Sequence, residues 1–415
     1  MNSPGPVDST TDPVSLAFAT VIDQVRAQRL DGKVADYIPE LAKADPDEFA
    51  IAATSVAGHI YEAGDSGSRF TIQSISKAFV YALALRTCGI EAVRRRVGVE
   101  PSGEAFNAIS FDDQQRPANP LINAGAVVTT SLIPATTGEE RFERIRAGLS
   151  EFAGRQLEAD ERVAASESST GDRNRALAML ARSYGMLGST ATTVDEVVEP
   201  YFRQCALLID CTDLAVMGAT LANHGENPIT GRQVVSPTIA RQVLSLMSSC
   251  GMYDRSGQWL FEVGMPAKSG VGGGIVAVAP GEYGIGVYSP PLDAVGNSSR
   301  GVTALRTLAE EFGLHLFNHP DRPTSPIARL ETADDGDRIT LRLRGTIDFI
   351  AAEQVAYTAA EALADAGSTT LLLDLVDVTA VTTVAARLIR DLCTQAGTAR
   401  RWRVVVRDPA GLLSS

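Results

Sequence analysis

The tetrapeptide Ser74-Ile75-Ser76-Lys77 constrains the fold and chemistry of this chain more than any other segment. It opens an apolar stretch that we expect to form a helix from about Ser74 to a stop at Gly89, with Thr71 as a candidate cap. Residues three apart share a helix face, so the Ser74 hydroxyl and the Lys77 amine lie within reach of each other. Serine acyl-transfer enzymes without a catalytic histidine activate their nucleophile with such a pair. The chain has only four histidines, His59, His224, His315 and His319, and three lie in turn-like or linker contexts, so a Ser-Lys site is favoured over a Ser-His-Asp triad.

Each of these residues also has an ordinary structural interpretation. Ser74 alone is typical of a helix N-terminus, and Lys77 alone is typical of a solvated helix face. Gly272-Gly273-Gly274 is not a phosphate loop, because no Lys-Ser/Thr pair follows it. The remaining candidates have equally simple explanations as caps, packing aromatics or a solvated carboxylate: Asn123, Asn174, Tyr201, Tyr253 and Glu167.

Composition and charge exclude several functional classes. The formal net charge is -13, and the densest basic run, Arg94-Arg95-Arg96, lies beside an expected helix end, so nucleic-acid binding is not expected. The five cysteines are scattered without CxxC spacing, which indicates reduced thiols, a cytoplasmic location and no metal site. No apolar run reaches the about 18 residues of a membrane span, so no membrane association is expected. Residues 1–13 are expected to be a disordered tail rather than a signal peptide.

The order of hydrophobic patterns predicts the architecture of residues 14–316. A helix over residues 14–30 precedes two strands, 48–58 and 59–64, joined at Ala57-Gly58. Residues 91–224 are mostly helical in pattern, with loops at 117–120 and 166–173 and a clear helix over 213–223. Paired strands at 274–279 and 283–289 and a helix at 297–312 close the domain. This order predicts an α/β protein with one antiparallel sheet layer, an all-α lobe and a site at their junction.

A second, smaller α/β domain follows a proline-rich linker. Three prolines within residues 320–326 indicate a stiff spacer, which we place at residues 317–327. Beyond it, apolar Ile339, Leu341 and Leu343 alternate with polar residues, as in a half-buried strand. A helix over 349–366, a buried strand over 371–376, a helix over 383–393 and a last strand over 403–406 complete a domain at residues 328–415.

Six ordered segments stand out across residues 14–316. They are Gly32-Lys33-Val34-Ala35-Asp36-Tyr37-Ile38-Pro39, Gln73-Ser74-Ile75-Ser76-Lys77, Asn119-Pro120-Leu121-Ile122-Asn123-Ala124-Gly125-Ala126, Gly171-Asp172-Arg173-Asn174, Gly251-Met252-Tyr253-Asp254 and Pro266-Ala267-Lys268-Ser269-Gly270-Val271. Together they resemble the serine-dependent glutaminase family, whose catalytic fold is similar to that of β-lactamases and penicillin-binding proteins. One SxxK motif is weak evidence, but six segments in order are strong.

Residues 328–415 resemble STAS domains, the fold of anti-sigma-factor antagonists. The resemblance rests on Gly345-Thr346-Ile347-Asp348 and on Leu373-Asp374-Leu375 followed by a loop into a helix. In that family the loop usually carries an Asp-Ser-Ser-Gly-like sequence that is phosphorylated on its first serine. The corresponding stretch of this chain looks like Thr382-Thr383-Val384-Ala385. Thr383 keeps a hydroxyl at the position of the first serine, whereas the Asp, the second Ser and the Gly of the motif are replaced. Phosphoregulation of the usual kind is therefore not expected, and Thr382 and Thr383 are the hydroxyls left for it.

The resemblance implies a glutaminase of the EC 3.5.1.2 type that forms a γ-glutamyl ester on Ser74 and needs no cofactor. Ser74 is the expected nucleophile, and Lys77 can accept its proton only if burial or nearby positive charge, to which Lys268 contributes, lowers its pKa. Backbone N–H groups of Ser74 and of Val271, on a strand edge, are the expected oxyanion hole. The implied catalytic residues are Ser74, Lys77, Tyr37, Tyr253 and Lys268, and the implied substrate-binding residues are Ser74, Asn123, Glu167, Asn174, Tyr201, Tyr253 and Val271.

Two other functions stay open at this point. The Ser-x-x-Lys and Lys-Ser-Gly elements also serve enzymes that recognise β-lactams, although this chain shows no export signal. Alternatively, the large domain senses glutamine without turning it over, and the STAS-like domain transmits the signal to a protein partner. We expect a homo-oligomer, a dimer or a tetramer, in which the tail domain is an interaction module.

Overall fold

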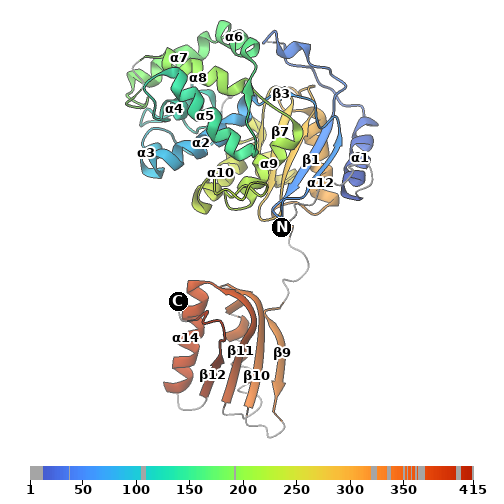
Figure 1. Ribbon diagram of the computed structural model, residues 1–415, viewed down its shortest axis with the longest axis vertical. Coiled ribbons are helices and arrows are strands. Elements are labelled where there is room, and N and C mark those ends of the chain that lie inside the picture. Colours follow the sequence, from blue (N-terminus) through green and yellow to red (C-terminus); the bar gives the residue numbers. More distant parts are fainter. Residues whose placement is uncertain are drawn as a thin grey trace. The chain divides into compact units, whose positions relative to one another are not determined.

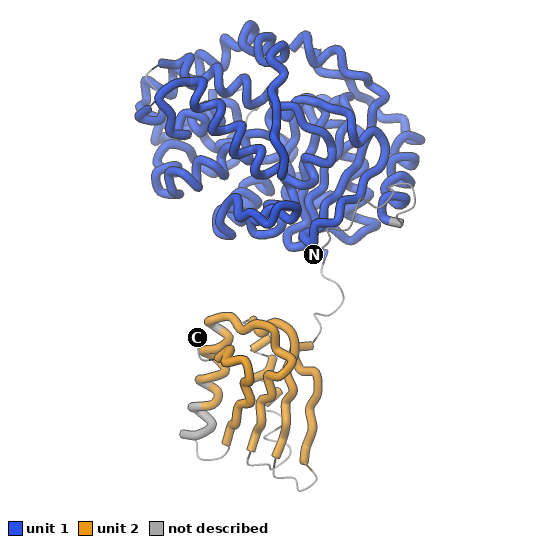
Figure 2. The backbone as a smooth tube through the Cα atoms, viewed as in Figure 1, with its two compact units in different colours: residues 1–318 blue, residues 319–415 orange. Residues whose placement is uncertain are grey.

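The computed structural model describes residues 13–36, 38–103, 109–190, 193–318, 325–333, 338–348, 351–352, 354–356, 358–359, 362, 370–398 and 403–413. The chain divides into two compact units, residues 1–318 and 319–415 (Figure 2). Each unit has its own hydrophobic core, which is the usual mark of a domain.

A five-stranded antiparallel sheet forms the centre of the first unit (Figure 1). The predicted strand pairs at 48–58 with 59–64 and at 274–279 with 283–289 are confirmed. Every residue of the inner strands β1 and β7 is buried, because both faces of the sheet are covered. The strand order is β2 (Ile60–Gly64), β1 (Ala50–Ser55), β8 (Tyr283–Tyr288), β7 (Gly274–Ala279) and β6 (Ala267–Ser269).

Helices cover both faces of this sheet. On one face, α1 (Pro13–Arg26) and α12 (Ser299–Glu311) pack against each other and against the strands. Helix α1 is shorter than predicted and ends at Arg26. On the other face, α9 (Cys211–Ala222) lies directly on β8, β7 and β1. Glycines make this close approach possible, since a Cβ on Gly284 would lie 1.9 Å from the backbone nitrogen of Ala219.

The region between β3 and β6 is mostly helical, as predicted, and builds the lobe beside the sheet (Figure 1). A small sheet of β3 (Phe70–Thr71), β5 (Leu207–Ile209) and β4 (Glu158–Ala159) was not predicted, because strands this short carry no periodic signal. The helices are α2 (Ser76–Cys88), α3 (Ile90–Arg94), α4 (Asn123–Ser131), α5 (Gly138–Ala153), α6 (Glu161–Ser169), α7 (Asp172–Ser183), α8 (Asp195–Cys205), α10 (Pro237–Cys250) and α11 (Ser256–Glu262), with the 3₁₀ turns η1 (Leu41–Lys43), η2 (Gln73–Ile75) and η3 (Tyr253–Arg255).

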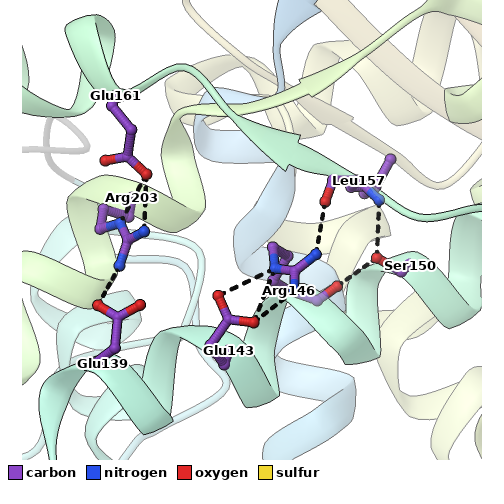
Figure 3. Close-up of polar contacts among 7 residues, drawn as sticks. All are labelled: Glu139, Glu143, Arg146, Ser150, Leu157, Glu161 and Arg203. Atoms are coloured by element: carbon purple, nitrogen blue, oxygen red, sulfur yellow. Dashed lines mark hydrogen bonds and ion pairs between the residues drawn. The ribbon is translucent and has the colours of Figure 1, made fainter.

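Charged side chains fix α5, α6 and α8 to one another (Figure 3). Arg203 of α8 pairs with Glu139 of α5 at 2.6 Å and with Glu161 of α6 at 2.8 Å. On α5, Arg146 donates to the carbonyl of Leu157 at 3.1 Å and so holds the segment that leads into β4. These contacts link the three helices, which matters because α6 and α8 both carry site residues.

The second unit is a four-stranded mixed sheet with helix α14 (Thr383–Thr398) packed on one face. The predicted alternation is confirmed, since Ile339, Leu341 and Leu343 are all buried. The described residues between 351 and 362 are helical, within the predicted helix over 349–366. The strand order is β12 (Arg403–Arg407), β11 (Thr370–Val381), β10 (Arg338–Ile347) and β9 (Ile327–Thr332). Strand β9 was not predicted, and residues 319–324 of the predicted linker lie outside the described residues.

Substituting Gly284→Ala should destabilise the first unit because the new methyl group would overlap the backbone of α9. Overpacking of this kind typically costs about 1–3 kcal/mol. Chemical denaturation of the two proteins measures the loss. Gly67→Ala is the matched control, since a Cβ there meets no atom within 4 Å. Equal stability of the two variants would contradict this account of how α9 packs.

Candidate active site

Ser74 lies in a 3₁₀ turn between a strand and a helix. Strand β3 ends at Thr71, η2 spans Gln73–Ile75, and the α-helical backbone begins only at Ser76. The prediction that Thr71 caps this helix is wrong: Ile72 occupies the N-cap of η2 without a side-chain bond, and the Thr71 hydroxyl accepts from the Gln73 amide at 3.1 Å. Gln73 has a φ of +51°, a left-handed conformation that few non-glycine residues adopt.

Lys77 is buried at the inner end of this turn. Its side chain is 1% exposed, which excludes the solvated-lysine interpretation, and Ser74 is only 8% exposed. The Lys77 Nζ donates to Asn123 Oδ1 at 2.6 Å. Burial lowers the pKa of Lys77 to about 8, although the charge of Glu167 acts in the opposite direction. An amine with this pKa can act as a proton acceptor near neutral pH.

Asn123, the first residue of α4, joins three other elements of the site. Its side-chain oxygen also accepts from the Tyr201 hydroxyl at 3.4 Å, and Tyr201 comes from α8. Its amide nitrogen donates to Asn174 Oδ1, on α7, at 3.0 Å. These contacts fix the orientation of the Asn123 amide, so that its carbonyl faces Lys77.

Glu167 is buried on α6, so the predicted loop over residues 166–173 is largely wrong. Its carboxylate accepts from Gln73 Nε2 at 2.7 Å and is 8% exposed, which excludes the solvated-carboxylate interpretation. Burial raises the pKa of Glu167 to about 7, opposed by the Gln73 hydrogen bond and the charge of Lys77. The site thus holds one carboxyl group that is half ionised near neutral pH.

Lys268 and Tyr253 face the turn from the sheet side. Lys268 Nζ donates to the Ser269 carbonyl at 2.5 Å and lies 4.3 Å from the centre of the Tyr253 ring. The Tyr253 hydroxyl donates to the same carbonyl at 3.2 Å and also shares a hydrogen bond with Ser74. Burial, and then the charge of Lys77, lowers the pKa of Lys268 well below its usual value. Burial is the main cause of the lowered pKa of Lys77, rather than the charge of Lys268.

Val271 lies in the turn between β6 and β7, and its predicted position on a strand edge is therefore wrong. The turn passes close to the segment that leads into Ser74, since a Cβ on Gly270 would lie 3.1 Å from the Ile72 carbonyl oxygen. A Cβ on Gly272 would lie 3.0 Å from the Thr71 carbonyl oxygen. The absence of side chains at both glycines lets the two backbones approach each other.

The structure brings together predicted site residues that are far apart in the sequence. Tyr37, which was also predicted, lies outside the described residues. Sequence reasoning assigned no role to Gln73, although it directly precedes Ser74, or to the buried thiol of Cys205. Burial raises the pKa of Cys205, whose neighbours include Ser76 and Tyr201. No group of three or more His, Cys, Asp or Glu side chains suited to a metal ion occurs among the described residues.

An antiparallel sheet beside a mostly helical lobe, with a buried Ser-Lys pair at their junction, defines the β-lactamase-like class of folds. The chain belongs to the glutaminase family, whose model matches residues 32–317, and a STAS domain model matches residues 329–410.

The similar proteins agree with this assignment. A glutaminase of Corynebacterium glutamicum is 44% identical over 383 residues, which cover 92% of this chain and 91% of that protein. Glutaminase 2 of Bradyrhizobium diazoefficiens is 55% identical over 298 residues, 72% of this chain. The chain spans only 47% of that relative and 61% of Glutaminase 1 from the same organism.

Solved structures show the same similarity in three dimensions. The alignment with the native form of Mglu covers 96% of this chain and 99% of the Mglu chain, with a TM-score of 0.83 and 43% sequence identity. Mglu in its glutamate form matches with a TM-score of 0.82 at 40% identity. Within the part of the chain that the structure describes, no helix combines the length and the hydropathy needed to cross a membrane.

Glu167→Gln should stabilise the protein increasingly as the pH rises from 5 to 8. The raised pKa means that the folded state binds more protons than the unfolded state between about pH 4.5 and 7, so native stability falls as pH rises through this range. Glutamine does not ionise, and the difference in unfolding free energy between variant and native protein should grow by up to roughly 3 kcal/mol.

Denaturant titrations at several pH values measure this difference. Glu226→Gln is the control, because Glu226 is exposed and lies outside the site. A stability difference that does not change with pH would show that the Glu167 carboxylate is not destabilised by burial.

Proposed function

We propose that this protein hydrolyses L-glutamine to L-glutamate and ammonia through a γ-glutamyl ester on Ser74. The observation that carries the proposal is the buried Lys77 amine, whose pKa of about 8 suits a proton acceptor, next to Ser74 at the junction of sheet and lobe. Membership of the glutaminase family and the similarity to Mglu in its glutamate form support the choice of substrate.

Lys77 takes the proton of the Ser74 hydroxyl as the serine oxygen attacks the side-chain amide of glutamine. A neutral amine has one lone pair and two hydrogens, and one of the hydrogens is held by Asn123 Oδ1. This bond limits the directions in which the lone pair can point. Asn123 therefore orients the base, and Asn174 and Tyr201 keep the Asn123 amide in place.

Tyr253 relays to the leaving ammonia the proton that Lys77 has taken from Ser74. Burial raises the pKa of its hydroxyl, so the group stays protonated and can donate. Its hydrogen bond with Ser74 supports this role. Lys268 holds the Ser269 carbonyl that also accepts from Tyr253, and by resemblance Tyr37 assists the proton transfer.

Backbone N–H groups of Ser74 and Val271 stabilise the oxyanion of the tetrahedral intermediate. The support for this pair is the close approach of the Gly270–Gly272 segment to the turn that carries Ser74. Loss of one such donor typically costs about 3 kcal/mol of transition-state stabilisation. Water then attacks the ester and releases glutamate.

The substrate's own charges select a free amino acid. Glu167 faces its ammonium group, which a glutamine inside a peptide lacks. The remaining contacts, by resemblance, come from Asn123, Asn174, Tyr201, Tyr253 and Val271. An ammonium beside Glu167 also offsets the negative charge that favours protonated Lys77, so substrate binding favours the neutral base.

The two other functions fit the site less well. A glutamine sensor has no need for a buried amine with a lowered pKa, whereas a proton acceptor does. A β-lactam-recognising enzyme shares the Ser-x-x-Lys and Lys-Ser-Gly elements, and acylation of Ser74 by a penicillin, detected by intact mass, would support it.

L-Glutamine should be turned over to equimolar ammonia and glutamate, with little turnover of L-asparagine and none by Ser74→Ala. Coupled assays for both products measure this, and calorimetry shows whether the Ser74→Ala variant still binds glutamine. Glutamine binding without ammonia release by the folded native protein would favour the sensor instead.

For the second unit we propose an interaction or oligomerisation module that modulates the activity of a homo-oligomer. Thr382 caps α14, since its hydroxyl accepts from the Ala385 N–H at 3.4 Å. Thr382 and Thr383 are both exposed, and because the Thr382 hydroxyl is engaged in the cap, Thr383, the first residue of the helix, is the hydroxyl more available for modification. The cytoplasmic location stays a prediction.

Truncation after Phe317 should leave a folded first unit, because this unit has its own core. We expect it to differ from the full chain in assembly state by sedimentation or in glutamine kinetics. Unchanged assembly together with unchanged kinetics would remove the proposed role of the second unit.

A further inference from the structure

A chain of buried hydrogen bonds runs behind the turn that carries Ser74. The Thr130 hydroxyl donates to Gln204 Oε1 at 2.9 Å, Gln204 Nε2 donates to the Ser76 hydroxyl oxygen at 3.4 Å, and the Ser76 hydroxyl donates to the Gln73 carbonyl at 2.7 Å. Thr130, Gln204 and Ser76 are each 0% exposed. Neither the proposed reaction nor the resemblance gives these three side chains a role.

The direction of each bond follows from the one before it. Thr130 donates to the carbonyl oxygen of the Gln204 side-chain amide, so the NH₂ group of that amide faces Ser76. A donor on the Ser76 oxygen leaves the hydroxyl proton free to point at the Gln73 carbonyl. In a dry interior, such a chain is costly to break, because a group that loses its partner has no water to replace it.

The chain ends on the strained residue before the nucleophile. Gln73 keeps its left-handed φ of +51° only if the surrounding structure holds it there. Ser76 holds the Gln73 carbonyl, while Glu167 and Thr71 hold its side chain. The peptide that joins Gln73 to Ser74 is therefore fixed from both sides.

The same chain connects three helices that each carry a site residue. Thr130 lies on α4 with Asn123, Gln204 lies on α8 with Tyr201, and Ser76 lies on α2 with Lys77. A shift of any one helix would change a bond that ends at the nucleophile turn.

We propose that Ser76 and Gln204 are positioning residues that hold the Ser74 hydroxyl in its reactive direction by fixing the Gln73 backbone. They act through Gln73, and neither is proposed to touch the substrate. The inference rests on the proposed function, in which Ser74 is the nucleophile.

The test compares steady-state kinetics of Ser76→Ala, Gln204→Met and the double variant with the native chain. We expect kcat for glutamine to fall about tenfold to a hundredfold in each, the effect of a small misplacement of a reacting group. KM should stay within about twofold, because the substrate contacts remain. The double variant should lose no more than the worse single variant, since both changes break one chain.

Two threonines on α4 supply a matched pair of controls. Thr129→Val removes a buried hydroxyl that bonds only the Gly125 carbonyl of its own helix, and it should leave kcat unchanged. Thr130→Val removes the first donor of the chain and should lower kcat by about twofold to tenfold, the size of one neutral hydrogen bond. This variant decides the question if the Ser76 or Gln204 variants do not fold.

The inference is overturned if Thr130→Val matches Thr129→Val in kcat, or if the folded Ser76 and Gln204 variants lose only thermal stability. Losses in kcat that multiply in the double variant would also overturn it. Failure of the proposed function looks different, because Ser74→Ala would then keep the turnover of the native chain.

Discussion

The burial of the Lys77 amine is the constraint on which the rest of the site depends. A lysine that is 1% exposed cannot keep its charge without compensation, and its pKa falls to about 8. A second buried lysine, Lys268, lies on the opposite side, so the surroundings cannot hold both amines charged. One carboxyl group, Glu167, and one amide, Asn123, are the main polar groups set against them. Burial therefore favours the neutral form of both amines.

Such a site is stable only if its walls do not move. The wall on the lobe side comes from α4, α6, α7 and α8, and Arg203 holds α8 to α5 and α6 through two carboxylates. The wall on the sheet side is the β6–β7 turn, whose glycines approach the segment that leads into Ser74 closely. Helix α9 packs closely on the sheet at Gly284, which has no side chain to keep the two backbones apart. The favourable free energy of packing between the helices and the sheet thus offsets the unfavourable free energy of burying charged groups at the junction.

Patterns in the sequence predicted the elements with strong periodicity and missed those set by distant contacts. Both hairpins of the central sheet follow from apolar runs separated by glycine-containing turns, and the structure confirms them. The 3₁₀ turn at Ser74 could not be predicted, because Gln73 is held in place by Glu167, 94 residues away, and Ser76 by Gln204, 128 residues away. Glu167 in a helix and Val271 in a turn were missed for the same reason, since local residue preference is weak where tertiary contacts decide. The two-unit organisation was predictable because composition changes sharply at the proline-rich segment.

In the proposed reaction, recognition and activation use the same charges. Glu167 has to be ionised to bind an ammonium group, and Lys77 has to be neutral to accept a proton. In the free protein these two states oppose each other, because an ionised Glu167 raises the pKa of Lys77 and a charged Lys77 lowers that of Glu167. When the substrate's ammonium group is bound, it pairs with Glu167 in place of the charged Lys77. The Lys77 amine can then lose its proton at a lower free-energy cost. A ligand without that ammonium leaves the carboxylate facing Lys77, which favours the protonated form of the base. Selectivity for a free amino acid therefore follows from the electrostatics of the base as well as from contacts with the ligand.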